Sequence, residues 1–121
     1  MTERATTESK FTRVKTTFGA FSGTRGTLYT CPANCRSRII SLFAEAASGT
    51  DVTVTIEIFK NDVSTYFKVT NEAGLTKGQP TNYASVDIIL EAGDLYVITA
   101  GGSAPQVDAF VTVEETFKPN G

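Results

Sequence analysis

The sequence predicts an all-β protein, folded as an antiparallel β-sandwich of the jelly-roll or immunoglobulin-like type. Threonine, valine and isoleucine make up 36 of the 121 residues, against five leucines, and β-branched side chains fit pleated sheets better than helices. Residues 52–60 and 107–117 alternate between apolar and polar side chains, which is the period of a half-buried strand. Several short strands separated by turn residues are typical of a sandwich.

Seven strands are expected, and residues 12–18 offer an eighth. The expected strands are residues 26–31, 36–46, 52–60, 63–69, 86–90, 95–100 and 107–117. In the second of them, Ile40, Leu42 and Ala44 would face the core, since alternate residues point to one side of a strand. Gly93 is expected to make a tight turn, and residues 101–105 (Gly-Gly-Ser-Ala-Pro) are expected to form a loop that interrupts the strands.

The length of 121 residues suits one domain, but the charge is unevenly spread. Residues 1–25 carry a net charge of +3 and residues 26–121 a net charge of −5. We therefore predict a basic N-terminal arm, residues 1–25, ahead of a β-sandwich domain, residues 26–121. The partner-binding residues predicted in the arm are Arg4, Lys10, Phe11, Arg13, Val14, Lys15, Phe18 and Phe21.

Two interpretations of this arm stay open. It is either a frayed terminus whose charges only keep it in water, or a segment that docks on an acidic neighbour such as an adjacent copy of the chain. The three phenylalanines favour docking, because a solvated tail has little use for them. Direct binding of nucleic acid is disfavoured, since the arm has no arginine cluster and the protein is acidic overall.

The composition argues against an enzyme and predicts no cofactor. The chain contains no histidine and no tryptophan, which removes histidine-based catalytic triads and zinc sites with histidine ligands. Cys31 and Cys35 are too few for a metal site and are expected to be reduced thiols, although a disulfide across their turn is conceivable. A carboxylate hydrolase is kept only as a formal alternative. Its candidate acids, expected to face outward, are Asp87, Glu91, Asp94, Glu114 and Glu115.

Neither end of the sequence suggests export or insertion into a membrane. No apolar run approaches the roughly 20 residues that cross a bilayer, and the first ten residues lack the hydrophobic stretch of a signal peptide. We therefore expect a protein that is made in the cytoplasm and has no membrane partner.

The longest unpatterned segment, residues 71–84, is a candidate contact surface, because long loops in small domains often carry function. Its contact candidates are Leu75, Lys77 and Tyr83. A mobile crossover between the sheets is an equal alternative. Together with the loop at 101–105, with Tyr83 as a stacking platform, this segment would suit a module that binds a host receptor or a carbohydrate.

Five segments of the sequence together carry a resemblance to a known class of proteins. They are Thr-Leu-Tyr-Thr-Cys-Pro-Ala-Asn at 27–34, Arg-Ile-Ile-Ser-Leu-Phe at 38–43, Val-Thr-Val-Thr-Ile-Glu-Ile at 52–58, Leu-Glu-Ala-Gly-Asp at 90–94 and Val-Thr-Val-Glu-Glu at 111–115. Over about residues 26–116, this pattern resembles small virion structural proteins of tailed bacteriophages. The resemblance implies a β-sandwich that decorates or joins parts of a phage particle at the capsid, neck or tail. It implies no catalytic residues.

The sequence therefore predicts a non-enzymatic component of a virion, made in the host cytoplasm. Its partners would be capsid, neck or tail subunits and further copies of itself, and the arm and the sheet edges would make the contacts. The binding of a host receptor or a carbohydrate remains the alternative function.

Overall fold

The computed structural model describes residues 11–83 and 88–117, and in this part of the chain it contains seven β-strands and no helix. The strands are β1 (Phe11–Phe21), β2 (Gly26–Thr30), β3 (Cys35–Lys60), β4 (Thr65–Gly74), β5 (Thr81–Asn82), β6 (Ile89–Leu90) and β7 (Leu95–Phe117). All ladders between the named strands are antiparallel. The predicted all-β fold is therefore confirmed.

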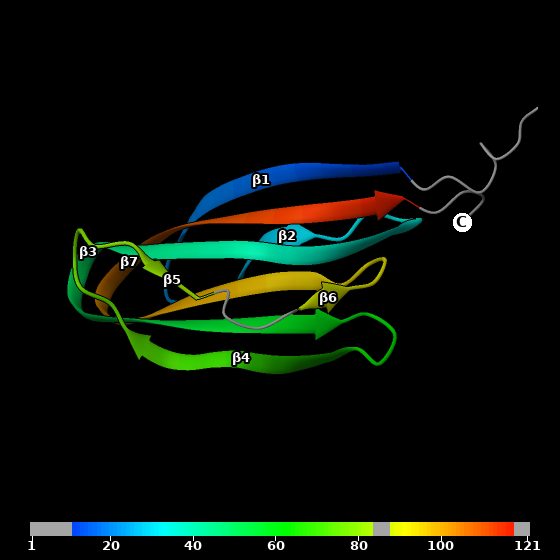
Figure 1. The fold of residues 1–121 in the computed structure, drawn as a ribbon. Helices are drawn as coiled ribbons and strands as arrows, with labels where there is room; N and C mark the ends of the chain where they lie inside the picture. Colours follow the sequence, from blue (N-terminus) through cyan, green and yellow to red (C-terminus); the bar gives the residue numbers. More distant parts are fainter. Residues whose placement is uncertain (1–10, 84–87, 118–121) are drawn as a thin grey trace, which may run out of the picture.

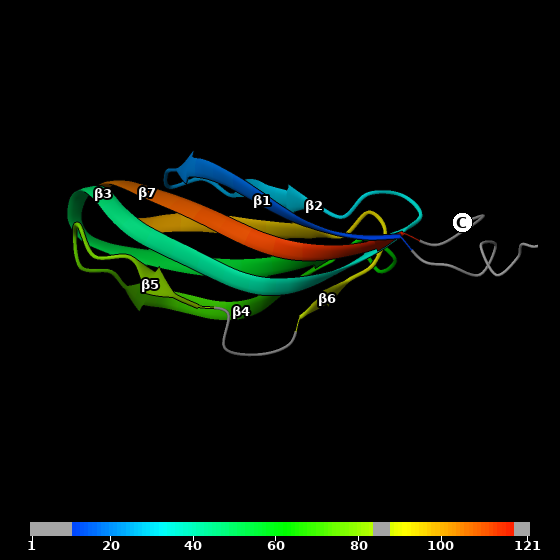
Figure 2. The same cartoon turned by 45° about the horizontal axis from the view of Figure 1, so that its top comes forward.

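Two long strands, β3 and β7, each run through both layers of the molecule (Figure 1). The first part of β3, residues 35–48, pairs with the last part of β7, residues 106–117, in a first layer that also holds β1, β5 and β6. The last part of β3, residues 53–59, pairs with the first part of β7, residues 95–101, in a second layer that also holds β2 and β4. Figure 2 shows both strands turning together at one end of the molecule.

This shared turn corrects two expectations. The residues predicted as a loop, 101–105, are part of one continuous strand, β7, and the strands predicted separately at 36–46 and 52–60 are joined in β3. The reason is that β3 and β7 bend as a pair and keep a ladder with shifts in register. Gly49 and Gly102 have positive φ angles of 110° and 113°. A side chain at either glycine would meet backbone atoms of the facing strand within 3 Å, so glycine permits the close approach.

The core lies between the two layers. It is built from alternate residues of the long strands, among them Leu42, Ile56, Ile98 and Val111, which are fully buried. The prediction that Ile40 faces the core is wrong. The register shifts between Ile39 and Ser41, so that Ile39 is buried and Ile40 exposed, as expected where a β-bulge changes the side to which a residue points.

The remaining predicted strands are found with different bounds. Strand β4 begins and ends later than the predicted 63–69, and β6 covers only the last two residues of the predicted 86–90, of which 86 and 87 lie outside the described residues. Gly93 has the expected positive φ, at 87°. The candidate strand at 12–18 is the centre of β1.

Candidate assembly surface

Strand β1 forms one end of the sheet path and pairs only with β7 among the described residues. Its eleven residues match eleven residues of β7 with no shift in register. The opposite edge of β1 has no strand beside it in the described part of the chain, so a row of backbone N–H and C=O groups faces outward there. Unpaired edges of this kind can accept a strand of another chain.

The outward face of β1 carries two large apolar side chains among threonines. Val14 and Phe18 are 63% and 83% exposed. In the β1–β7 register, Phe18 lies opposite Phe110, which in turn lies opposite Phe43 of β3. The rings of Phe43 and Phe110 stack with centroids 5.2 Å apart. We call Phe18, Phe110 and Phe43 the aromatic row; it crosses three strands on the outside of the first layer.

The inward face of β1 is held by a buried carboxylate. The Arg13 Nε donates to Glu115 Oε1 at 2.7 Å, and the Glu115 side chain has no exposed surface. The Tyr29 hydroxyl donates to the other carboxylate oxygen and lies 2.6 Å from the Ser37 Oγ. The Arg13 guanidinium also lies 4.9 Å from the centre of the Phe117 ring. These contacts join β1, β2, β3 and β7 at one end of the sandwich.

The electrostatics of Glu115 follow from these contacts. Burial alone would raise the pKa of the carboxyl group, but the hydrogen bonds from Tyr29 and Arg13 outweigh burial and lower the pKa below its usual value. Burial together with the hydrogen bond to Glu115 raises the pKa of Tyr29. At neutral pH Glu115 is therefore a carboxylate and Tyr29 a neutral phenol, and their contacts with Arg13 hold β1 against the sandwich.

The two cysteines lie beside this network as free, buried thiols. Their sulfur atoms lie 3.3 Å and 3.7 Å from the Ser37 Oγ. Burial is the main cause that raises the pKa of Cys31 to about 11, so at neutral pH the thiol is not ionised and is a poor nucleophile. In the described part of the chain, no group of histidine, cysteine and acidic residues could hold a metal ion.

The acids that we expected to face outward occupy different environments. Glu115 and Asp94 are buried, contrary to that expectation, because each has several partners. The Asp94 carboxylate accepts bonds from the Lys60 Nζ at 2.6 Å and from two backbone N–H groups. Glu91 and Glu114 form ion pairs with arginines on β3. Asp87 lies outside the described residues.

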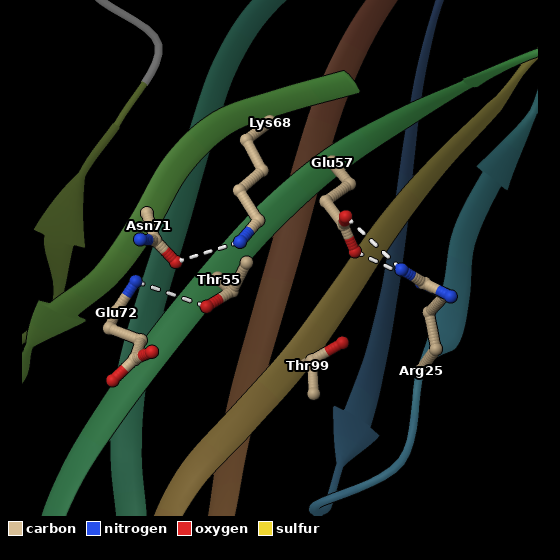
Figure 3. A pocket seen from close by; sticks show the side chains of 7 residues that line it. All are labelled: Arg25, Thr55, Glu57, Lys68, Asn71, Glu72 and Thr99. Carbon is tan, nitrogen blue, oxygen red and sulfur yellow. Dashed lines mark hydrogen bonds and ion pairs between the residues drawn. The ribbon is translucent and has the colours of Figure 1, made fainter. Parts of the chain in front are cut away.

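A shallow polar cleft of about 340 Å³ lies on the second layer (Figure 3). Arg25, which follows β1, binds both oxygens of Glu57 and stacks over the Tyr66 ring at 3.7 Å. Glu57 points outward, as the alternation in 52–60 predicts, yet it is buried because these side chains cover it. This pairing could not be predicted from the sequence, since Arg25 and Glu57 are 32 residues apart.

The predicted loop contacts do not form one exposed platform. Leu75 and Tyr83 are half-buried and pack against the core, whereas Lys77 is exposed. The backbone N–H of Tyr83 donates to the carbonyl of Leu42 at 2.8 Å, and burial raises the pKa of the phenol. Tyr83 thus packs mainly as part of the fold.

The predicted arm residues fall into two groups. Arg4 and Lys10 lie outside the described residues. The others are in β1, so the predicted boundary at residue 25 falls between two strands of one sheet. Of these, Phe21 belongs to the core, and the rest lie on the surface of the strand. Phe43 and Phe110 were missed, although the alternation in 107–117 already placed Phe110 on the outward side.

No family model and no curated protein matches this sequence. Among solved structures, the fold is similar to that of a Bacillus endospore appendage protein described as forming disulfide-linked pili. The TM-score is 0.54 at 12% identity, over 92% of this chain and 90% of that one. The chain therefore shares its fold with this pilus protein.

The capsid likeness comes from infectious bursal disease virus. The Gx strain gives a TM-score of 0.57 at 14% identity, over 90% of this chain and 33% of the viral chain. The D431N mutant of its VP2 protein, seen as T=1 particles, gives 0.50 at 15% identity, over 89% and 32%. This chain therefore spans about a third of the viral proteins. The chain therefore shares the jelly-roll fold of these capsid proteins, and the likeness concerns the fold alone.

No described helix is of the length and apolar character that crossing a bilayer requires.

Proposed function

We propose that this protein is a non-enzymatic structural subunit that assembles through the edge and outward face of β1. The observation that carries the proposal is an open strand of eleven residues on which Val14 and Phe18 are more than 60% exposed. A strand added to an open edge gains main-chain hydrogen bonds and buries alternate side chains. Many weak contacts of this type on one particle give stable attachment through effective concentration.

In its finer form, the proposal places the protein in the virion of a tailed bacteriophage, where it decorates or joins capsid, neck or tail subunits. The resemblance of its turns and strands to phage structural proteins supports this location, and the fold it shares with capsid and pilus proteins agrees with it. The protein would be made in the host cytoplasm and built into the particle there.

A pair of matched variants tests the assembly surface. Phe18→Glu places a charge on β1, and Phe67→Glu makes the same change on β4, where Phe67 is 51% exposed. We expect the native chain and Phe67→Glu to show a mass above that of the monomer by light scattering, and Phe18→Glu to be monomeric. Assembly of Phe18→Glu at the native level would contradict the proposal.

The alternative function is the binding of a host receptor or a carbohydrate, and the polar cleft on the second layer favours it. Hydroxyl, amide and carboxylate groups of Thr55, Thr99, Asn71 and Glu72 line this cleft (Figure 3). A glycan array with the native protein and with Glu72→Ala separates the two functions. Specific binding by the monomer, lost in Glu72→Ala, would support this alternative.

A further inference from the structure

The three longer edge strands of the molecule differ in how well they could accept a neighbour. Strand β4 contains two register shifts against β3, and Glu72 in it has a positive φ of 48°. Strand β2 has five residues and one shift. Strand β1 has eleven residues, no shift against β7 and no proline. Bulges and short edge strands hinder pairing with another chain. Of the three edges, β1 is therefore the one best suited to pairing.

We propose that β1 pairs with β1 of a second copy, antiparallel, across a two-fold axis that passes midway between the two Thr16 residues. This inference rests on the proposed function and names the partner of the same surface. A two-fold axis makes an interface self-complementary, so one strand supplies both sides. Thr16 is the middle residue of Phe11–Phe21, and an axis there pairs all eleven residues.

This register matches the exposed apolar side chains with each other. It places Phe18 of one copy opposite Val14 of the second copy, and the reverse pair forms on the other side of the axis. Both residues lie on the outward face, where they are 83% and 63% exposed in the single chain. An aromatic side chain opposite a β-branched one is a favourable cross-strand pair. The aromatic row of each copy would continue across the joint.

This register keeps the charged residues of β1 from lying directly opposite each other. The strand carries two cations, Arg13 and Lys15, and no anion. In the proposed register Arg13 faces Gly19 of the second copy and Lys15 faces Thr17, so no cation lies directly opposite another. A register centred on Lys15 would oppose the two lysines, and one centred on Val14 would oppose arginine and lysine. Like charges directly opposite are destabilising, which disfavours both of these registers.

Cysteine cross-linking of the full chain tests the axis. In Thr16→Cys the two new cysteines would lie directly opposite each other. Their Cα atoms would be about 4.5–5.5 Å apart, a separation that suits a disulfide. In Thr12→Cys they would be about 27 Å apart, eight residues along the strand. We expect oxidised glutathione to link most of Thr16→Cys into a covalent dimer and to leave Thr12→Cys and the native chain unlinked, because Cys31 and Cys35 are buried.

A mixture provides the positive control: Thr12→Cys combined with Ala20→Cys should form a mixed dimer, because these residues face each other in the proposed register. Equal linking of Thr12→Cys and Thr16→Cys would overturn the axis. Light scattering on the same samples separates the two claims. A mass above that of the monomer without linking at residue 16 overturns the axis and leaves the proposed function standing; a monomer at every concentration overturns both.

Discussion

At the scale of single residues, the inner face of β1 depends on Glu115. Its carboxylate is buried and bound by Arg13 and Tyr29. Removing Arg13 or Tyr29 would leave this buried carboxylate with one partner fewer, which costs more than losing an ion pair in water. The glutamate next to it, Glu114, faces outward and forms a long ion pair of 3.5 Å with Arg38. The two adjacent residues therefore make a matched comparison.

The first prediction concerns the dependence of stability on pH. The pKa of Glu115 is lower in the folded chain than its ordinary value near 4.5, and that of Asp94 is lowered as well. Their stabilisation is fully present above pH about 4.5 and is lost as the pH falls through the folded values. Urea unfolding between pH 7 and pH 3 should show this loss in the native chain and in Glu114→Gln, and a smaller loss in Glu115→Gln. An unchanged acid profile in Glu115→Gln would contradict the assignment.

The second prediction concerns two buried tyrosines. The Tyr96 hydroxyl has no hydrogen-bond partner among the described residues, whereas the Tyr29 hydroxyl contacts Ser37 and Glu115. A buried polar group without a partner costs roughly 1–3 kcal/mol. Tyr96→Phe should therefore raise the free energy of unfolding or leave it unchanged, and Tyr29→Phe should lower it by about 1–3 kcal/mol. Denaturant unfolding at pH 7 measures both, and a clear loss in Tyr96→Phe would be the contrary result.

At the scale of elements, β1 has one end in the core and a long face in solvent. Phe21 is 8% exposed and packs against the backbone of Gly26, where an added side chain would meet its ring at 2.6 Å. Phe18 contributes little to the single chain, since most of its surface stays in water. Phe21 is thus part of the core, and Phe18, three residues before it, is left for the proposed contact.

The third prediction follows from this difference. Phe21→Ala should lower the free energy of unfolding by about 3–5 kcal/mol, because it leaves a cavity in the core. Phe18→Ala should change it by less than about 0.5 kcal/mol, as expected for an exposed position. Urea unfolding at a protein concentration low enough to keep the chain monomeric measures both. Similar losses in the two variants would show that the outward face of β1 is part of the fold.

Most elements of the fold were predictable from the sequence because the strands alternate clearly. The bulge at Ile40 was not, since a single inserted residue reverses the facing of its neighbours without altering the composition. Nor was the continuity of β3 and β7 through their bend, where glycines that usually mark a loop instead allow two strands to approach closely.

The site was less predictable than the fold. The exposed phenylalanine and valine of β1 were found from sequence, because apolar residues in a polar, basic segment are conspicuous. The buried state of Glu115 was not, since its partners Tyr29 and Arg13 are 86 and 102 residues away in the chain. Only the order of the strands in the sheet brings them together.

At the scale of the whole molecule, the jelly roll leaves β1 at the end of its sheet path, where a neighbour can extend the sheet. The net charge of −2 is small, so repulsion between copies is weak. The open edge and the aromatic row are the features on which the proposed assembly rests, because repeated weak contacts add up to stable attachment.

Hydrogen exchange of the β1 amides tests the central claim most directly. In an antiparallel ladder, alternate residues of β1 donate to β7 and the others point toward the open edge. As the protein concentration rises and subunits assemble, the exchange of the edge-facing amides within residues 11–21 should slow, while that of β4 stays unchanged. If β1 exchanged at one rate at every concentration while the protein assembled, β1 would not be the assembly surface.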